Sequence, residues 1–385
     1  MYNRNKVFAA ACTGLFLFGM TLITLGSILP ELEAIYAAEQ LNTGLLASVL
    51  PAGILLGSLV FGPIVDRYGY KMLLIVSVLI SAIALEGLAY SHEVSLLYVF
   101  IFLIGFGGGI INGVTSALVA DISSKNKGAS LSLLGVSYGV GALGMPLLLG
   151  ILSKTLSYNT ILASVGFFMI LPIVFFILTK FPAPRQAQGF PLKAGIKLLK
   201  EPMLMLTSFF LFFQSAVEML VNNWTTSYLQ HELSISNEKG KYALSFMLGG
   251  LTLTRLLLGG LLKKVSSFAL MFVSLLVVAA GSLILLSTHS YNMAFAALVM
   301  IGAGLAGGFP VILGYIGQLY AQLSGTAFSI ALVIGLTGNI LINYFFGRIV
   351  STYNAGYMPY AVLACIACML VIFLIIRNRI SSKVK

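Results

Sequence analysis

The 385-residue chain is 59% hydrophobic and only 9% charged, whereas roughly 25% of the residues in a soluble domain are charged. Its net charge of +11 does not indicate nucleic-acid binding, because the basic residues lie between apolar runs. Each run has about 20 residues, enough to cross a bilayer as a helix. The composition therefore predicts an all-α membrane protein with many spans and excludes a soluble fold.

Twelve apolar runs predict twelve transmembrane helices in two groups of six. We place the first group at residues 7–30, 42–64, 71–90, 95–120, 127–151 and 159–179, and the second at 203–229, 241–262, 267–287, 291–319, 325–350 and 356–378. Between the groups, Lys180 to Lys200 contains three prolines and five basic residues. This pattern indicates two six-helix domains, 1–179 and 203–385, joined by a linker of residues 180–202.

Lys and Arg are distributed unequally between the two sides of this topology. The N-terminus, the even-numbered loops, the linker and the C-terminal tail hold 17 of the 22 basic residues. Basic loops stay in the cytoplasm, so we expect a cell (plasma or inner) membrane protein with both termini cytoplasmic. The first run is too long for a signal peptide and lacks a clean cleavage site, so we expect it to remain as a span.

The two groups of spans share glycines at a constant spacing of 197 residues. Chance is a poor explanation, because the spans themselves are in register at the same spacing. Such a parallel repeat is typical of secondary transporters. The matched pairs are Gly62 and Gly259, Gly105 and Gly302, Gly107 and Gly304, Gly128 and Gly325, Gly141 and Gly338, and Gly150 and Gly347.

The loop between the second and third spans carries a specific pattern of glycines and charges. From Gly62 to Lys71 it reads GPIVDRYGYK, which resembles the signature loop G-x-x-x-D-R-x-G-x-R/K of the major facilitator superfamily. The resemblance implies the twelve-helix fold of that family and assigns Gly62, Asp66, Arg67, Gly69 and Lys71 to a cytoplasmic gating loop. A carboxylate and cations at helix ends can form such a breakable latch, although the same charges also set orientation.

The second half has only a degenerate copy of this loop. At the repeat spacing, the positions that match Asp66 and Arg67 are Lys263 and Lys264, so this copy has no acid. Arg255, one to two helical turns earlier, either replaces the missing charge in the gating loop or extends to the cytoplasmic surface.

One acid interrupts the otherwise apolar seventh span, FFQSAVEMLVNNWTTSYL. Gln214, Glu218 and Asn222 are four residues apart, so they share one helix face. An ionisable group at membrane depth is costly and by default marks a functional site, the alternative being a helix–helix staple. All three histidines fall in predicted loops, so Glu218 is the predicted proton-coupling residue.

The segment beginning at Ala216 is similar to the G-x-E-x-x-x-x-x-W-x-x-x-Y/F-L segment of the fucose-proton symporter family, which includes glucose/mannose symporters. Residues 302–310 resemble the G-x-x-x-A-G-x-x-P segment of the same family. The resemblance implies sugar symport coupled to protons or sodium, with no other cofactor. Ala216 replaces the usual glycine, and Thr21 and Thr24 lie in the first span where fucose transporters carry an acid. These departures argue against fucose itself.

Amides and one aromatic ring in the spans suit a neutral, hydroxylated solute. Trp224 fits an interfacial aromatic belt equally well, and Asn112 fits an interhelical hydrogen bond equally well. The predicted solute-binding residues are Thr21, Thr24, Asn112, Gln214, Asn222, Asn223, Trp224, Gln318, Asn339 and Asn343.

The sequence thus predicts a secondary active transporter, not an enzyme, that works as a monomer and binds no metal. We expect it to carry a hexose or related neutral solute with a proton by alternating access. A proton-coupled exporter of drugs or metabolites on the same fold is the alternative. It is favoured by Gly139 to Pro146, which partly matches the Gly-Pro motif of drug-proton antiporters.

Overall fold

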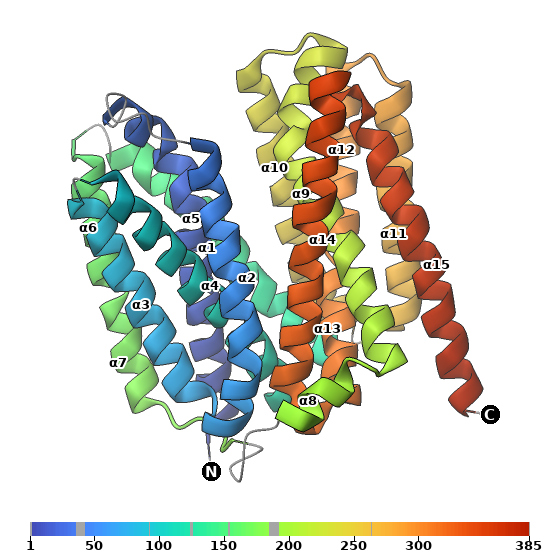
Figure 1. Cartoon of the computed structure of the whole chain (residues 1–385). Helices are drawn as coiled ribbons and strands as arrows, with labels where there is room; N and C mark the ends of the chain where they lie inside the picture. The colour runs from blue at the N-terminus through green and yellow to red at the C-terminus, as the bar shows by residue number, and fades with distance from the viewer. Residues whose placement is uncertain are drawn as a thin grey trace. The chain divides into compact units, whose positions relative to one another are not determined.

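The computed structural model describes residues 2–35, 43–91, 93–123, 126–152, 155–184, 192–262 and 264–384 (Figure 1). Within these ranges the regular structure is helical and no strand occurs. Twelve helical segments of the described chain are long and apolar enough to cross a membrane. The all-α fold class and the twelve predicted spans are therefore confirmed.

The observed helices follow the predicted spans closely and extend several of them. The first six spans are α1 (Arg4–Ile35), α2 (Thr43–Tyr68), α3 (Tyr70–Tyr90), α4 (Val94–Ile122), α5 (Lys127–Leu152) and the pair α6 (Tyr158–Phe168) and α7 (Ile170–Leu178). The next six are α9 (Pro202–Leu233), α10 (Asn237–Leu261), α11 (Ser267–Ser287), the pair α12 (Tyr291–Leu305) and α13 (Gly308–Leu319), α14 (Ser324–Thr352) and α15 (Met358–Val384). A short helix, α8 (Leu192–Leu198), lies in the predicted linker.

Two predicted spans are broken into helix pairs, and a proline accounts for each break. Proline lacks an N–H and clashes with the carbonyl four residues before it. Pro172 therefore disrupts the helix at Phe168, where α6 ends. Pro310 has the same effect at Ala306, directly after the end of α12.

The chain divides into two compact units that do not coincide with the two runs of six spans. The first unit contains Met1–Ser124, Ser137–Gly195 and Tyr320–Ser329, and the second contains Lys125–Val136, Ile196–Leu319 and Ile330–Lys385. The N-terminal end of α14 thus packs in the first unit, and the N-terminal end of α5 packs in the second.

In the first unit, α4 packs against α1, α2 and α3, and α3 also packs against α6 and α7 (Figure 1). One close approach of α4 to α2 occurs at Gly105, where a Cβ atom would lie 2.3 Å from the carbonyl oxygen of Leu50. Glycine is required at such a crossing, because small residues let helix backbones touch.

In the second unit, α12 packs against α10 and α11, while α9 packs against α15. The crossing of α12 with α10 occurs at Gly302, whose Cβ would lie 2.1 Å from the carbonyl oxygen of Met247. Gly302 and Met247 each lie 197 residues after Gly105 and Leu50, which form the equivalent crossing of the first unit. The glycine repeat in the sequence therefore reflects a repeated helix crossing.

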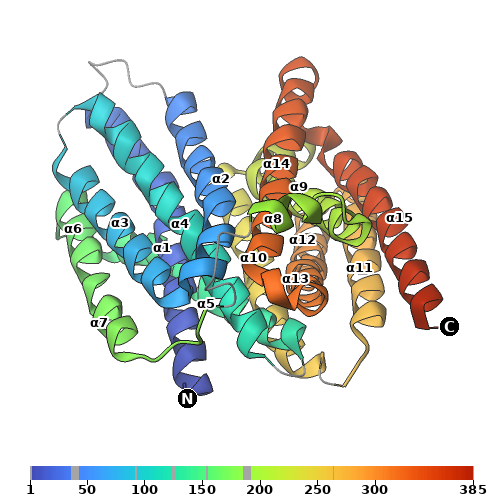
Figure 2. The ribbon, with the colours of Figure 1, turned by 60° about the horizontal axis from the view of Figure 1, so that its bottom comes forward.

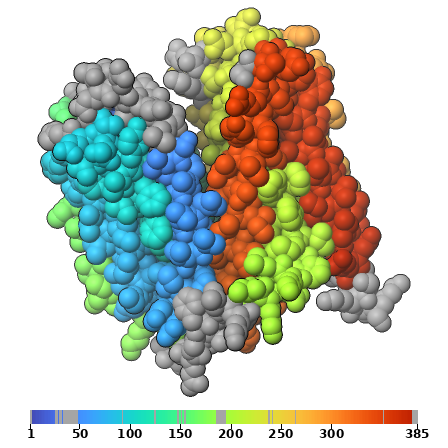
Figure 3. Space-filling view, viewed as in Figure 1, coloured from blue at the N-terminus to red at the C-terminus, as the bar shows by residue number. Residues whose placement is uncertain are grey.

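The outer faces of the helices carry large apolar side chains. On α3, the exposed residues Met72, Val76, Leu79 and Ile83 form a stripe at helical spacing. Figure 3 shows the outer surface of this part of the chain in light blue, and that of α14 and α15 in orange and red. Exposed apolar stripes on long apolar helices fit contact with lipid chains rather than water.

Candidate functional site

Glu218 and Arg255 form a buried ion pair in the second unit. Glu218 lies near the middle of α9, a helix that begins with Pro202 and ends before Ser234, which has a left-handed backbone (φ 51°). Arg255 projects from α10, and its Nη2 atom lies 3.9 Å from Oε1 of Glu218. The side chains of Glu218 and Arg255 are 18% and 8% exposed, respectively. An acid and a base from two neighbouring spans therefore share one interior position.

The N-terminal end of α5 makes room for Arg255. The hydroxyl of Ser132 donates a hydrogen bond of 2.6 Å to the backbone carbonyl of Arg255, which ties α5 to α10. A Cβ atom at Gly135 would lie 3.0 Å from Cδ of Arg255, so a larger residue would crowd the arginine. The alternative that Arg255 extends to the surface is wrong, because its side chain is enclosed by α5 and α9.

The ion pair is not a hydrogen bond, since 3.9 Å exceeds the roughly 3.2 Å limit for a good N–H···O contact. The Nε atom of Arg255 is buried and has no hydrogen-bond partner among the described residues. Breaking a buried ion pair is costly because it leaves the remaining charge uncompensated. Neutralising Glu218 therefore leaves the buried charge of Arg255 without its ionic partner.

This pairing was not predicted, although the sequence contained a signal for it. Arg255 was the one basic residue assigned to the interior of a predicted span, and charges at membrane depth pair with one another. The partner depends on how α9 and α10 are rotated about their axes, which the spacing within each helix does not determine.

The other two members of the predicted stripe on α9 differ in their surroundings. Gln214 is buried, and its Nε2 donates a hydrogen bond of 3.0 Å to the carbonyl of Leu305, at the break between α12 and α13. A Cβ at Gly308 would lie 2.3 Å from Oε1 of Gln214. Gln214 thus stabilises a helix break. Asn222 is half-buried, and its amide makes a weak contact of 3.9 Å to Sδ of Met219.

Three predicted amides form a chain between α9 and α14. Asn223 donates to Oδ1 of Asn343 at 3.4 Å, and Asn343 donates to Oδ1 of Asn339 at 3.2 Å. Next to this chain, the ring of Trp224 meets that of Phe346 edge to face, with centroids 5.5 Å apart. The indole nitrogen of Trp224 is buried with no hydrogen-bond partner among the described residues.

The predicted residues of the first unit are less polar in their surroundings. Thr21 and Thr24 are buried, and their hydroxyls donate to the carbonyls of Phe18 and Met20 in the same helix. Asn112 is half-buried, and its side-chain amide makes no hydrogen bond to the described residues. Both threonine hydroxyls thus already donate within their own helix, whereas the N–H groups of the Asn112 amide have no acceptor among the described residues.

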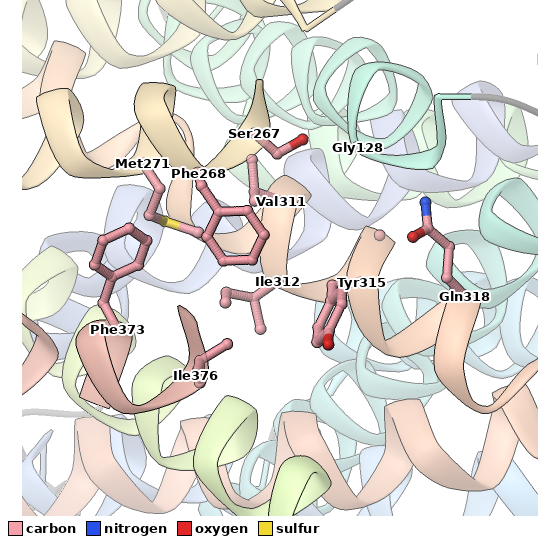
Figure 4. Close-up of a pocket in the computed structure, with 11 residues that line it drawn as sticks. Gly128, Ser267, Phe268, Met271, Val311, Ile312, Tyr315, Gln318, Phe373 and Ile376 are labelled. Carbon is pink, nitrogen blue, oxygen red and sulfur yellow. The ribbon is translucent and has the colours of Figure 1, made fainter. Parts of the chain in front are cut away.

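Gln318 borders a different cavity of the second unit, of about 230 Å³. Figure 2 shows α13 nearly end-on with α11 beside it, and the cavity is bordered by these two helices and α15. In Figure 4, the aromatic rings of Phe268 and Phe373 lie around it, and the amide of Gln318 lies beyond Tyr315. Neither Glu218 nor the amide chain borders this cavity, so Gln318 belongs to another part of the unit.

The signature loop uses its acid as a helix cap in the first unit. Asp66 is buried and accepts hydrogen bonds from the backbone N–H groups of Gly325 (3.1 Å) and Thr326 (2.9 Å). It also accepts one of 2.6 Å from the hydroxyl of Thr326. The carboxylate thus satisfies free donors at the positive end of α14. Close contact is possible because Gly62 faces Gly325, with a hypothetical Cβ only 2.6 Å from its carbonyl.

The remaining loop residues have distinct roles. Gly69 adopts a positive φ of 83°, which favours glycine, and separates α2 from α3. Nζ of Lys71 donates to the carbonyl of Ile177 near the end of α7, at 2.5 Å. Arg67 lies over the ring of Tyr68, 5.1 Å from its centroid. The sequence did not predict Asp121, which accepts a hydrogen bond from the hydroxyl of Tyr70.

No cluster of three or more His, Cys, Asp or Glu side chains that would suit a metal occurs in the described part of the chain. The candidate site in the second unit instead combines one acid, Glu218, one base, Arg255, and several amides. This set can exchange one proton, hold one compensating charge and hydrogen-bond to hydroxyls or carboxylates.

Two sequence relatives are transport proteins. The chain is 26% identical over 169 residues to the multi-drug resistance efflux pump PmrA of Streptococcus pneumoniae, a match that covers 43% of this chain and 42% of the pump. It is 25% identical over 291 residues to the cis,cis-muconate transport protein of Acinetobacter baylyi, covering 68% of each chain. The first match thus spans less than half of the pump.

The fold is shared with a solved transporter. The fucose:proton symporter FucP of E. coli superposes with a TM-score of 0.81 over 97% of this chain and 98% of that one, at 18% identity. The sequence profile of the Major Facilitator Superfamily matches residues 11–342, and that family comprises transporters. With its twelve spans and its repeated six-helix pattern, the chain is a member of the Major Facilitator Superfamily.

Proposed function

We propose that the chain is a symporter that carries a sugar or related polyhydroxylated solute together with a proton by alternating access. The observation that carries this proposal is Glu218, a carboxyl group in the interior of a membrane-spanning helix with Arg255 as its ionic partner. Such groups mark proton relays in transporters. We place the protein in the cell membrane as a monomer, with both termini in the cytoplasm.

Glu218 is suited to carry the proton because burial disfavours its charged form, while Arg255 favours it. The balance between these two effects changes whenever water or a solute reaches the pair. Binding a proton on one side of the membrane and losing it on the other then requires only a change in access.

The amides supply the solute contacts of this proposal. Asn222, Asn223, Asn339 and Asn343 lie on α9 and α14 of the same unit and offer both donors and acceptors to hydroxyl groups. The shared fold with a protein named as a fucose:proton symporter supports a sugar. The sequence relatives are named for drugs and for cis,cis-muconate, which makes export of a drug or metabolite the second candidate.

Replacement of Glu218 by Gln tests the proton site. In proteoliposomes with an imposed pH gradient, we expect the wild-type protein to accumulate a solute from a sugar panel. Glu218→Gln retains the shape of the side chain but cannot release a proton, so accumulation should fall by tenfold or more, on the order of 1.4 kcal/mol, while exchange of solute at equal pH survives.

Asn222→Gln is the matched control, because it also alters the polar face of α9 without removing a charge. It should change the apparent solute affinity while leaving proton coupling intact. Accumulation by Glu218→Gln at the wild-type level would sink the proposal. A sodium gradient in place of the pH gradient distinguishes the two ions, and outward transport of drugs would favour the exporter.

A further inference from the structure

Among the described residues, Glu218 and Arg255 have no charged partner within ion-pair distance except each other. Neither side chain forms a second ion pair with any described residue, and the pair is more than four-fifths buried. The groups that contact Arg255 from α5 are the hydroxyl of Ser132 and Gly135, both uncharged. The charges of the pair therefore balance each other alone.

Protonation of Glu218 upsets this balance. The carboxylate becomes a neutral acid, and Arg255 keeps its charge because a guanidinium does not lose its proton in proteins. A single uncompensated charge at membrane depth is costly. A neutral solute does nothing to lower that cost, whereas a solute with one negative charge removes it.

We infer that Arg255 binds a carboxylate of the transported solute, so that the solute is a hydroxylated monocarboxylate of the sugar-acid type rather than a neutral sugar. This rests on the proposed function for the proton on Glu218, and it changes only the charge of the solute. The proton neutralises Glu218, the carboxylate neutralises Arg255, and the loaded pair again has no net charge.

The geometry of Arg255 fits this role. Guanidinium N–H groups lie in a fixed fork that matches a carboxylate through two parallel hydrogen bonds. Glu218 does not occupy this fork, since the two groups are 3.9 Å apart, and the buried Nε has no partner among the described residues. A planar anion thus finds guanidinium donors that no described residue occupies, on a side chain packed against Gly135 of α5.

The alternative is that Arg255 only steadies Glu218. The two roles differ in what happens when Glu218 is removed. A purely structural arginine would gain no ligand, whereas an anion-binding arginine would lose its internal competitor. Each role also predicts a different response to the charge of the solute.

The test compares acids with their neutral amides. Purified protein is titrated by calorimetry with D-glucuronate and D-glucuronamide, and with a panel of smaller and larger monocarboxylates and their amides. A charge-assisted hydrogen bond contributes about 1.5–3 kcal/mol, so at least one acid should bind about tenfold to 100-fold more tightly than its amide. Failure of every acid to exceed its amide overturns the inference.

Four variants test whether Arg255 is the group responsible for the preference for the acid over its amide. Arg255→Gln should abolish the preference for the acid, and Arg255→Lys should keep part of it, because lysine retains the charge but not the fork. Arg348→Gln, which removes an exposed arginine from α14, should have no effect. Glu218→Gln should bind the acid about tenfold more tightly than the wild type at neutral pH. Misfolding cannot produce such a gain in affinity, so the gain would be specific to the loss of the Glu218 charge. A weaker or unchanged affinity of Glu218→Gln for every acid counts against the inference.

Uptake measurements separate this inference from the proposed function. If a neutral sugar is accumulated on a pH gradient and no acid is, the inference fails while proton-coupled symport stands. If acids bind through Arg255 but a pH gradient drives no accumulation, symport fails while the solute class stands.

Discussion

At the scale of single residues, Asp66 shows how one carboxylate can hold a helix end. It accepts three hydrogen bonds from Gly325 and Thr326, in the first turn of α14. A helix start exposes backbone donors that need partners, and a negative charge there is favoured by the helix dipole. The signature loop thus contributes to stability as well as to any gating.

Replacing Asp66 with Asn should weaken this cap. Asn offers one acceptor oxygen and turns an N–H group toward donors, so at least one of the three hydrogen bonds is lost. We expect a loss of about 1–3 kcal/mol in stability, seen as a lower midpoint of thermal unfolding in detergent. Glu93→Gln is the control, because Glu93 precedes α4 without a side-chain cap. Equal midpoints for both variants would contradict the cap.

The residues of the candidate site were predicted to different degrees. Glu218 was identifiable because an acid in an apolar span has few explanations. Its pairing with Arg255 was not predicted, since contacts between helices depend on rotation and tilt. Gln214 shares a helix face with Glu218, but its amide donates to the carbonyl of Leu305, at the break between α12 and α13. The sequence of α9 does not indicate that break.

At the scale of helices, the repeat is visible as matching crossings. Gly107 of α4 and Gly304 of α12 lie against the carbonyls of Ser77 and Ser274, with hypothetical Cβ distances of 2.8 Å and 2.7 Å. Both pairs are related by the same spacing of 197 residues as the crossings at Gly105 and Gly302. Glycines chosen from the sequence alone therefore marked contacts, because small residues let two helix backbones approach this closely.

Adding a methyl group at Gly302 should separate α12 from α10. The new Cβ would lie 2.1 Å from a backbone oxygen of Met247, so Gly302→Ala should cost about 1–3 kcal/mol through overpacking. Gly260→Ala in α10 meets no atom within 4 Å and should be neutral or slightly stabilising. Thermal unfolding of the two variants side by side checks this. A stable Gly302→Ala variant would mean that the crossing adjusts freely.

At the scale of the whole molecule, each compact unit contains a helix end from the other run of six spans. Residues 320–329 complete the first unit, and residues 125–136 complete the second. In the second unit, Lys127 donates to the carbonyl of Gly317 at the end of α13, with a distance of 2.7 Å. The spans were predictable from hydropathy, but this exchange was not, because it joins segments about two hundred residues apart.

A chain divided in the predicted linker, residues 180–202, should reveal this dependence. Expressed alone, the first fragment lacks Gly325 and Thr326, the partners of Asp66, so it should be degraded by protease faster than when both fragments are expressed together. The control is an intact protein cut at an engineered linker site after purification, which should keep its unfolding midpoint. Equal protease resistance of the lone fragment would contradict the expectation.

The exchanged helix ends also impose an order on biosynthesis. The segment that caps Asp66 emerges from the ribosome roughly 260 residues after Asp66 itself. At a synthesis rate of about 5–20 residues per second, that interval lasts on the order of ten seconds or more. During this time Asp66, at the end of α2, lacks the hydrogen-bond donors of Gly325 and Thr326. Insertion of α2 and capping of α14 by Asp66 are therefore separate events, and the second requires α14 to have been synthesised.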